Sequence, residues 1–118
     1  MMYLCGVNKT KDMNKEEKQF VNVLHSVAIN NLPSSSQVWL YGSRARGDAH
    51  QDSDWDLLIL LDKDRVERSD FDDYGYPFVE AGWDHNAGVS PQIYTFKEWQ
   101  ERSFTLYYKN VEHDKIRI

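Results

Sequence analysis

Apolar residues recur at helical spacing soon after the start of the chain, behind a polar stretch that we expect to be a loose tail over residues 1–13. Asn14 and Glu17 stand in the spacing of a capping box, which predicts that a helix begins there. Leu32–Pro33 and the serines that follow predict its end. The apolar positions of this helix share one face: Phe20, Leu24, Val27 and Ala28.

Two short apolar runs then predict neighbouring strands. Residues 38–41 read as a buried strand that stops abruptly at Gly42–Ser43. Residues 43–48 suit a short helix or a turn. Residues 54–61 form the strongest strand pattern in the chain, with an acidic beginning and a dense run of Leu and Ile.

The second half of the chain predicts another helix and a third strand. We expect helix over residues 63–86, interrupted or kinked by Gly75 and Pro77. Residues 89–96 read as a strand, and Pro91 within it indicates an edge position or a bulge.

A final helix is expected over residues 97–108, with Trp99, Phe104 and Leu106 facing inward. The order of elements predicts an α/β (α+β) domain in which helices pack on a small mixed sheet. We expect a single domain over residues 14–118.

Composition excludes several classes of protein. The chain has 118 residues, a net charge of −5 and one cysteine, Cys5. The acidic balance argues against a general electrostatic grip on nucleic acid, and one cysteine excludes a disulfide scaffold. The longest apolar run, residues 57–61, is too short for a membrane span. We therefore expect a cytoplasmic protein, and whether it starts at Met1 or Met13 stays open.

Charged residues gather in the middle of the chain. Nine of the twelve Asp lie between Asp48 and Asp73, and four of the six Arg lie in the same third. Both signs of charge next to a glycine turn suit a ligand that consists of a phosphate group bound to a metal ion.

The break after the first strand is a candidate phosphate site. Gly42 lets a ligand approach the backbone closely, and a helix beginning at Ser43 would direct free N–H groups at an anion. The Ser43 hydroxyl can donate to a phosphate oxygen, and Arg44 or Arg46 can hold phosphates bidentately.

Asp54 and Asp56 form a candidate metal site. Side chains two residues apart on a strand leave the same face, with Cα atoms about 6.5 Å apart. Both carboxylates can therefore reach one hard cation, and Mg²⁺ is commonly held by one or two carboxylates together with substrate phosphates.

These segments share features with other kinds of site. A lone Asp-x-Asp is most often solvated surface, although the apolar run after Asp56 directs at least one acid toward buried ground. An EF-hand loop requires Gly at the position of Leu57 and Glu at that of Lys63. A P-loop requires Lys followed by Ser or Thr where the chain has Asp48–Ala49.

The spacing Gly42–Ser43, ten residues, then Asp54-x-Asp56 resembles the signature of the DNA polymerase β-like nucleotidyltransferase superfamily. The flanking residues look like those of its minimal nucleotidyltransferases. The resemblance implies the fold of that superfamily and transfer of a nucleoside monophosphate from a nucleoside triphosphate, ATP being expected. Gly42 and Ser43 would bind the β- and γ-phosphates, with Arg44 and Arg46 contacting phosphate or a partner. Asp54 and Asp56 would be catalytic and hold one Mg²⁺ ion, a second being left open.

One departure from that family concerns a third carboxylate, which its active enzymes usually carry on the next strand. Residues 89–96 contain no acid, and Gln92 is expected at the corresponding position. Glu80, Asp84 or an acid from a partner chain could substitute. Nucleotide binding is thus better supported than transfer.

The resemblance also suggests partners. Minimal members of the family often pair with a small helical protein of the HEPN type, in pairs that resemble toxin–antitoxin systems. A HEPN-type toxin is therefore the expected acceptor, with a small hydroxylated molecule such as an aminoglycoside as a variant.

Two other functions stay open: a module that binds nucleotide or partner without chemistry, and an RNA binder. The chain could also form a homo-oligomer through Tyr107, Tyr108 and the C-terminal segment, although core packing is the alternative use of those side chains.

Overall fold

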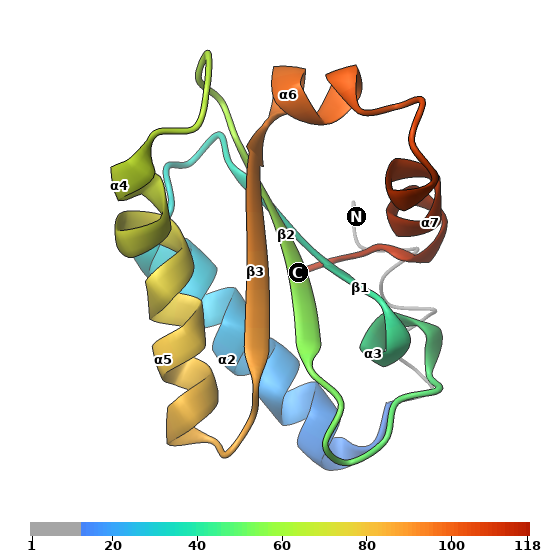
Figure 1. Cartoon of the computed structure of the whole chain (residues 1–118). Helices are drawn as coiled ribbons and strands as arrows, with labels where there is room; N and C mark the ends of the chain where they lie inside the picture. The colour runs from blue at the N-terminus through green and yellow to red at the C-terminus, as the bar shows by residue number, and fades with distance from the viewer. Residues whose placement is uncertain (1–12) are drawn as a thin grey trace.

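The structure is a computed structural model that describes residues 13–118. It contains four strands that form one sheet, in the order β3-β2-β1-β4 (Figure 1). Strand β1 is antiparallel to β2 and to β4, whereas β2 and β3 are parallel. The expected mixed sheet packed with helices is therefore confirmed. The elements in chain order are α2 (Lys15–Asn31), β1 (Gln37–Tyr41), α3 (Ser43–Arg46), β2 (Trp55–Leu61), α4 (Arg68–Asp70), the π-helix η1 (Phe71–Gly75), α5 (Tyr76–Asp84), β3 (Val89–Thr95), α6 (Phe96–Glu101), α7 (Leu106–Asp114) and β4 (Ile116–Arg117).

Helix α2 begins where the capping box predicted. The side chain of Asn14 accepts from the Glu17 N–H at 2.8 Å, and the Glu17 carboxylate accepts from the Asn14 N–H at 3.1 Å. These two bonds satisfy N–H groups that the first turn of a helix leaves without partners. Phe20 and Leu24 are buried, as their spacing indicated.

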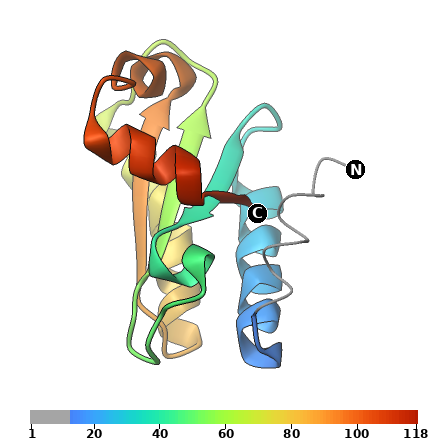
Figure 2. The ribbon, with the colours of Figure 1, turned by 90° about the vertical axis from the view of Figure 1, so that its right-hand side faces the viewer.

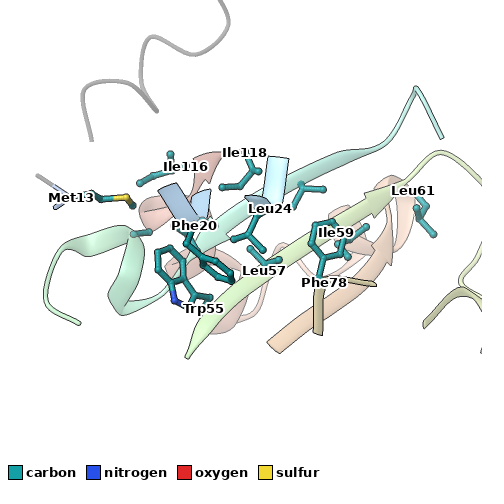
Figure 3. Close-up of a cluster of buried hydrophobic side chains, with 13 residues drawn as sticks. Met13, Phe20, Leu24, Trp55, Leu57, Ile59, Leu61, Phe78, Ile116 and Ile118 are labelled. Carbon is teal, nitrogen blue, oxygen red and sulfur yellow. The ribbon is translucent and has the colours of Figure 1, made fainter. Parts of the chain in front are cut away.

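Strand β2 is the centre of the molecule because it is covered on both faces. Its odd-numbered residues Trp55, Leu57, Ile59 and Leu61 pack in a core cluster with side chains of α2 and α5 (Figure 3). Leu58 and Leu60 point to the other face, where they pack with Trp99 of α6 and Val111 of α7. Figure 2 shows α2 and α7 on opposite sides of the sheet. Asp56 follows the same alternation and lies on the α7 side.

The segment expected as one interrupted helix over residues 63–86 is three consecutive helical pieces. The π-helix η1 ends at Gly75, and Pro77 stands in the first turn of α5, where its missing N–H costs nothing. Gly75 and Pro77 thus interrupt the α-helix as predicted, and residues 63–67 and 85–86 lie outside the helical pieces. Strand β3 occupies an edge of the sheet, which confirms the position inferred from Pro91.

The expected single helix over residues 97–108 is wrong. Helix α6 ends at Glu101, and Thr105 begins α7 by accepting from the Tyr108 N–H at 3.1 Å. Threonine is a favoured residue at the N-cap of a helix. A second helix therefore begins after Thr105, and the first does not continue through it. Trp99 is buried as expected, but Phe104 is 79% exposed and Leu106 is 72% exposed.

Two segments at the ends of the domain differ from the sequence pattern. Met13, the last residue of the expected tail, is 7% exposed and belongs to the core cluster with Phe20 and Trp55. The rest of that expected tail lies outside the described residues. Strand β4 has two residues, too few for a strand pattern, yet it completes the sheet beside β1. Within residues 13–118, no helix has the length and apolar character that crossing a membrane requires.

Candidate functional site

The turn after β1 lies directly against Asp56 of β2. Tyr41 and Asp56 are register partners, so Gly42 follows at the level of the Asp56 side chain. Gly42 has φ 76° and ψ −158°, a conformation open almost only to glycine. A Cβ on Gly42 would lie 2.5 Å from Asp56 Oδ2. The glycine is therefore required both by the backbone conformation and by the neighbouring carboxylate.

Asp54 has a similar relation to a second glycine. A Cβ on Gly88 would lie 2.5 Å from Asp54 Oδ1. Gly88 precedes β3, and its carbonyl accepts from the Trp55 N–H at 2.8 Å. The two acids expected to act together thus sit at the beginning of β2, each beside a residue without a side chain.

The two carboxylates repel each other. Burial raises the pKa of Asp56 above its ordinary value, and the negative charge of Asp54 raises it further, while Arg46 opposes the shift. A cation between the two acids would relieve this repulsion. Residues 13–118 hold no group of three or more His, Cys, Asp or Glu side chains arranged for a metal ion. Two carboxylates fit Mg²⁺, which takes its remaining oxygen ligands from phosphates and water.

Ser43 begins the short helix α3 and is half-buried. The turn is closed by the Gly42 carbonyl, which accepts from the N–H groups of Ala45 and Arg46 at 3.0 Å each. The Ser43 carbonyl accepts from the Gly47 N–H at 3.0 Å. Gly42 and Ser43 are thereby held next to Asp56, as their expected role in phosphate binding requires.

Arg46 lies on the outside of this turn. Its guanidinium is paired with Asp48 at 3.2 Å and with Asp114 of α7 at 2.9 Å. The Arg46 side chain is 46% exposed, and its charge reaches Asp56. It remains a candidate for phosphate contact, because its pair with the exposed Asp48 can exchange partners at low cost, although Asp114 is only 11% exposed.

Arg44, also expected to contact phosphate or a partner, makes its contacts within the fold. Its side chain is 10% exposed and its guanidinium is bound to carbonyl groups of the chain and to Glu17. The guanidinium also lies 4.8 Å from the ring centroid of Trp55, whose side chain points to the α2 side of the sheet. Arg44 is thus occupied within the fold, on the face opposite Asp56, and is not presented to a phosphate at the turn.

The neighbouring strand supplies no acid to the pair. Register places Ser90 beside Asp56, whereas Gln92 lies one step further along the same face, beside Leu58. Ser90 and not Gln92 therefore stands next to the candidate metal site. Glu80 and Asp84 are exposed residues of α5, which covers the opposite face of the sheet. They are not brought to Asp54 and Asp56.

Sequence reasoning missed a pair of tyrosines beside the site. The phenol oxygens of Tyr41 and Tyr107 lie 2.9 Å apart, and the rings meet edge to face. Burial raises the pKa of both phenols, and the charge of Asp56 adds to the shift. Tyr41 could have been found from the sequence, since it precedes Gly42 on a strand. Tyr107 could not, because it lies in α7, whereas the sequence predicted that this residue belongs to a helix over residues 97–108.

A cavity of about 1080 Å³ opens next to the acids, on the α2 side of the sheet. Asp54 and Asp56 do not line it. Its walls come from the first turns of α2, from the chain between α3 and β2, and from the turn before β3, with Phe20, Arg44, Trp55, His85 and Gly88 among the lining residues. The two acids on the α7 side of the sheet are therefore not part of this cavity.

Comparison with known proteins places the fold and the family. A search of curated proteins gives no significant match. A solved structure described as the crystal structure of a toxin-antitoxin with AMP-PNP is similar, with a TM-score of 0.59 and 17% sequence identity. The match covers 88% of this chain and 72% of that chain, and it shows a common fold. The family model for the nucleotidyltransferase domain matches residues 25–117, which include the Gly42–Ser43 turn, both acids and β3. The chain therefore belongs to the nucleotidyltransferase domain family.

Proposed function

We propose that this chain is a Mg²⁺-dependent nucleotidyltransferase that transfers a nucleoside monophosphate from ATP to a hydroxyl group of a HEPN-type toxin protein. The observation that carries the proposal is the contact between the Gly42–Ser43 turn and Asp56, beside Asp54. A phosphate-binding turn and a pair of metal-binding carboxylates must lie side by side for a metal-bound triphosphate to occupy both.

In this proposal the Gly42–Ser43 turn binds the β- and γ-phosphates through backbone N–H groups and the Ser43 hydroxyl. Asp54 and Asp56 hold Mg²⁺, which when bound neutralises charge on the phosphate oxygens. Arg46 leaves its exposed pair with Asp48 to contact phosphate or the partner.

The reaction is an in-line displacement at the α-phosphorus. A bond forms between the acceptor oxygen and the α-phosphorus, and the bond from the α-phosphorus to the oxygen of the β-phosphate breaks. Pyrophosphate leaves, and the hydroxyl proton of the acceptor passes to solvent. No third carboxylate stands beside Asp56 within residues 13–118 to take that proton. We therefore expect slow transfer unless the partner supplies an acid.

Two observations support the nucleotide and the partner. The similar solved structure is of a toxin-antitoxin with AMP-PNP, which has the adenosine and the three phosphorus atoms of ATP. The family model covers the part of the chain that contains the proposed site. The HEPN type of the partner rests on the resemblance of residues 38–62 to minimal nucleotidyltransferases.

The second candidate function is a nucleotide-binding antitoxin that performs no chemistry. Ser90 beside Asp56 favours it, because a neutral hydroxyl neither holds a divalent cation as a carboxylate does nor acts as a base. Both candidates use the same turn and the same acids, so they differ only in whether a product forms.

Label transfer separates the two functions. The protein is incubated with Mg²⁺, native cell extract and ATP labelled at the α- or the γ-phosphate. Nucleotidyl transfer places label from the α-phosphate, and none from the γ-phosphate, on an acceptor. The double variant Asp54→Asn, Asp56→Asn should lose this label, whereas Asp62→Asn should keep it. Asp62 is an exposed acid at the far end of β2 and makes a matched control.

ATP binding without α-label in any extract would favour the binding module. Label that persists in the double variant would show that the two acids are not the catalytic groups. Loss of label in Asp62→Asn as well would show that the assay responds to the loss of any surface acid in or next to this strand.

A further inference from the structure

Arg44 holds the chain segment that carries Asp54. Its Nε and Nη2 groups donate to the Ser53 carbonyl at 3.2 and 3.0 Å, and Nη2 also donates to the Gln51 carbonyl at 3.0 Å. Ser53 immediately precedes Asp54, and Trp55, against whose ring the guanidinium packs, immediately follows it. Arg44 therefore contacts both neighbours of Asp54, the backbone carbonyl of Ser53 and the ring of Trp55.

The other end of the same guanidinium is anchored to α2. Arg44 Nη1 pairs with Glu17 Oε2 at 3.1 Å, and the Glu17 side chain is 22% exposed. The second carboxylate oxygen of Glu17 is held by the capping box. Charge-assisted hydrogen bonds shielded from water are stronger than exposed ones. The Arg44 guanidinium is thus held by Glu17 on one side and by its contacts with residues 51–55 on the other.

Arg44 also follows Ser43 directly in the chain. The side chain that holds the segment before Asp54 is therefore attached to the residue next to the Gly42–Ser43 turn. Between Gly47 and Asp54 the chain has no helix or strand. Its local bonds are those of a turn: the Ser53 N–H donates to the His50 carbonyl at 3.0 Å, and the His50 N–H donates to Ser53 Oγ at 2.8 Å. Both of these bonds lie within residues 50–53 and do not tie the turn to α3, whereas the bonds from Arg44 do.

We infer that Arg44 is a positioning residue that sets the distance between Asp54 and the Gly42–Ser43 turn, so that the two parts of the site are in register before any ligand binds. The inference rests on the proposed function, because it assigns Asp54 to a metal ion. It replaces direct phosphate binding by Arg44, which would require the guanidinium to break its four hydrogen bonds and its contact with Trp55.

The test is Mn²⁺ binding, without nucleotide, to the unchanged chain and to Arg44→Gln, with free Mn²⁺ measured by electron paramagnetic resonance. Loss of a group that orients a metal ligand weakens metal binding by about 10- to 100-fold, which is the expected result. Hydrogen exchange of the amides at residues 50–55 is measured on the same samples and should become faster. If Arg44 contacted only phosphate, Mn²⁺ binding in the absence of nucleotide would not change.

Two further variants keep the test independent of folding. Glu17→Gln removes the charge facing Arg44 but keeps an oxygen for the capping box, so smaller effects of the same sign are expected, and it stands in if Arg44→Gln does not fold. Val111→Ala truncates a buried side chain in the cluster on the other face of the sheet. It should lower stability without changing Mn²⁺ affinity or exchange at residues 50–55.

Unchanged Mn²⁺ affinity or unchanged exchange in folded Arg44→Gln would overturn the inference. Failure of the proposed function looks different: the unchanged chain would then bind Mn²⁺ no better than Asp54→Asn, Asp56→Asn. The inferred role toward the metal would fall with it, and hydrogen exchange would report separately whether Arg44 holds residues 50–55.

Discussion

The carboxylate of Asp56 occupies the space that a side chain on residue 42 would need. A Cβ on Gly42 would come within 2.5 Å of Asp56 Oδ2, closer than real Cβ contacts. The backbone of the turn and the acid are therefore in direct contact, with no side chain between them. A phosphate bound at the turn would lie beside a cation bound at Asp56.

Gly42→Ala tests this contact. The alanine is strained at the observed φ of 76° and ψ of −158° by about 1–3 kcal/mol, and its Cβ must displace Asp56. We expect loss of stability together with loss of Mn²⁺ and ATP binding, measured by denaturant unfolding and by calorimetry.

Gly47→Ala is the control, because Gly47 has φ 86° but no atom within 4 Å of an added Cβ. It should lower stability by about 1 kcal/mol and leave ligand affinity unchanged. Equal loss of affinity in the two variants would mean that backbone strain alone explains the effect.

The strand register predicts where a third carboxylate would complete the site. Ser90 is the partner of Asp56, and Gln92 is the partner of Leu58. Ser90→Asp adds an acid next to Asp56, so the three carboxylates should bind Mn²⁺ more tightly than the unchanged chain. It should also lower stability in the absence of metal, since like charges gather at one place.

Gln92→Glu serves as the comparison, because it adds the same charge one step further along β3. We expect a smaller gain in Mn²⁺ affinity, measured by titration under identical conditions. A larger gain for Gln92→Glu would place the missing acid where the sequence alone suggested it, and would contradict the register argument.

The sequence predicted strands β1 to β3 and the turn after β1 because each has a strong local cause. Asn14 and Glu17 fixed the start of α2, Gly42 marked the break after β1, and Pro91 identified an edge strand. The proximity of Asp54 and Asp56 followed from the spacing of residues on a strand. These features depend on neighbours in the chain, which the sequence displays directly.

The roles of Arg44, Ser90 and Tyr107 could not be predicted because they depend on contacts between distant segments. Arg44 and Arg46 look equivalent in the sequence, yet Arg44 packs against Trp55 with 10% of its side chain exposed, whereas Arg46 is 46% exposed. Only the register of β2 with β3 shows that Ser90 and not Gln92 adjoins Asp56. The apolar residues at 99, 104 and 106 predicted one helix over residues 97–108, so the sequence did not show the break before Thr105.

That break leads to a prediction about stability. Trp99 is 1% exposed and packs with Leu58, Leu60 and Val111, whereas Phe104 is 79% exposed. Trp99→Ala should lower the free energy of unfolding by about 3–5 kcal/mol, and Phe104→Ala should change it by less than about 0.5 kcal/mol. Denaturant unfolding of the two variants measures the difference. A large loss for Phe104→Ala would restore the single inward-facing helix that the sequence suggested.

The last prediction concerns alkaline pH and the pair Tyr41–Tyr107. Burial raises the pKa of both phenols above their ordinary value of 10.0, and the charge of Asp56 raises both further. Their mutual hydrogen bond raises the pKa of Tyr107 and lowers that of Tyr41, where burial outweighs it. The folded chain therefore keeps these protons at a pH where the unfolded chain has lost them. By linkage, the stability that the pair contributes is fully present below pH 10.0 and declines as the pH rises above that value.

We expect a late step in the tyrosinate absorbance of the folded chain, and a fall in its free energy of unfolding over the same range. The double variant Tyr41→Phe, Tyr107→Phe should lose the late step and show a shallower fall. An absorbance titration with the same late step in the double variant would assign the delayed ionisation to other tyrosines and would remove the pair as its cause.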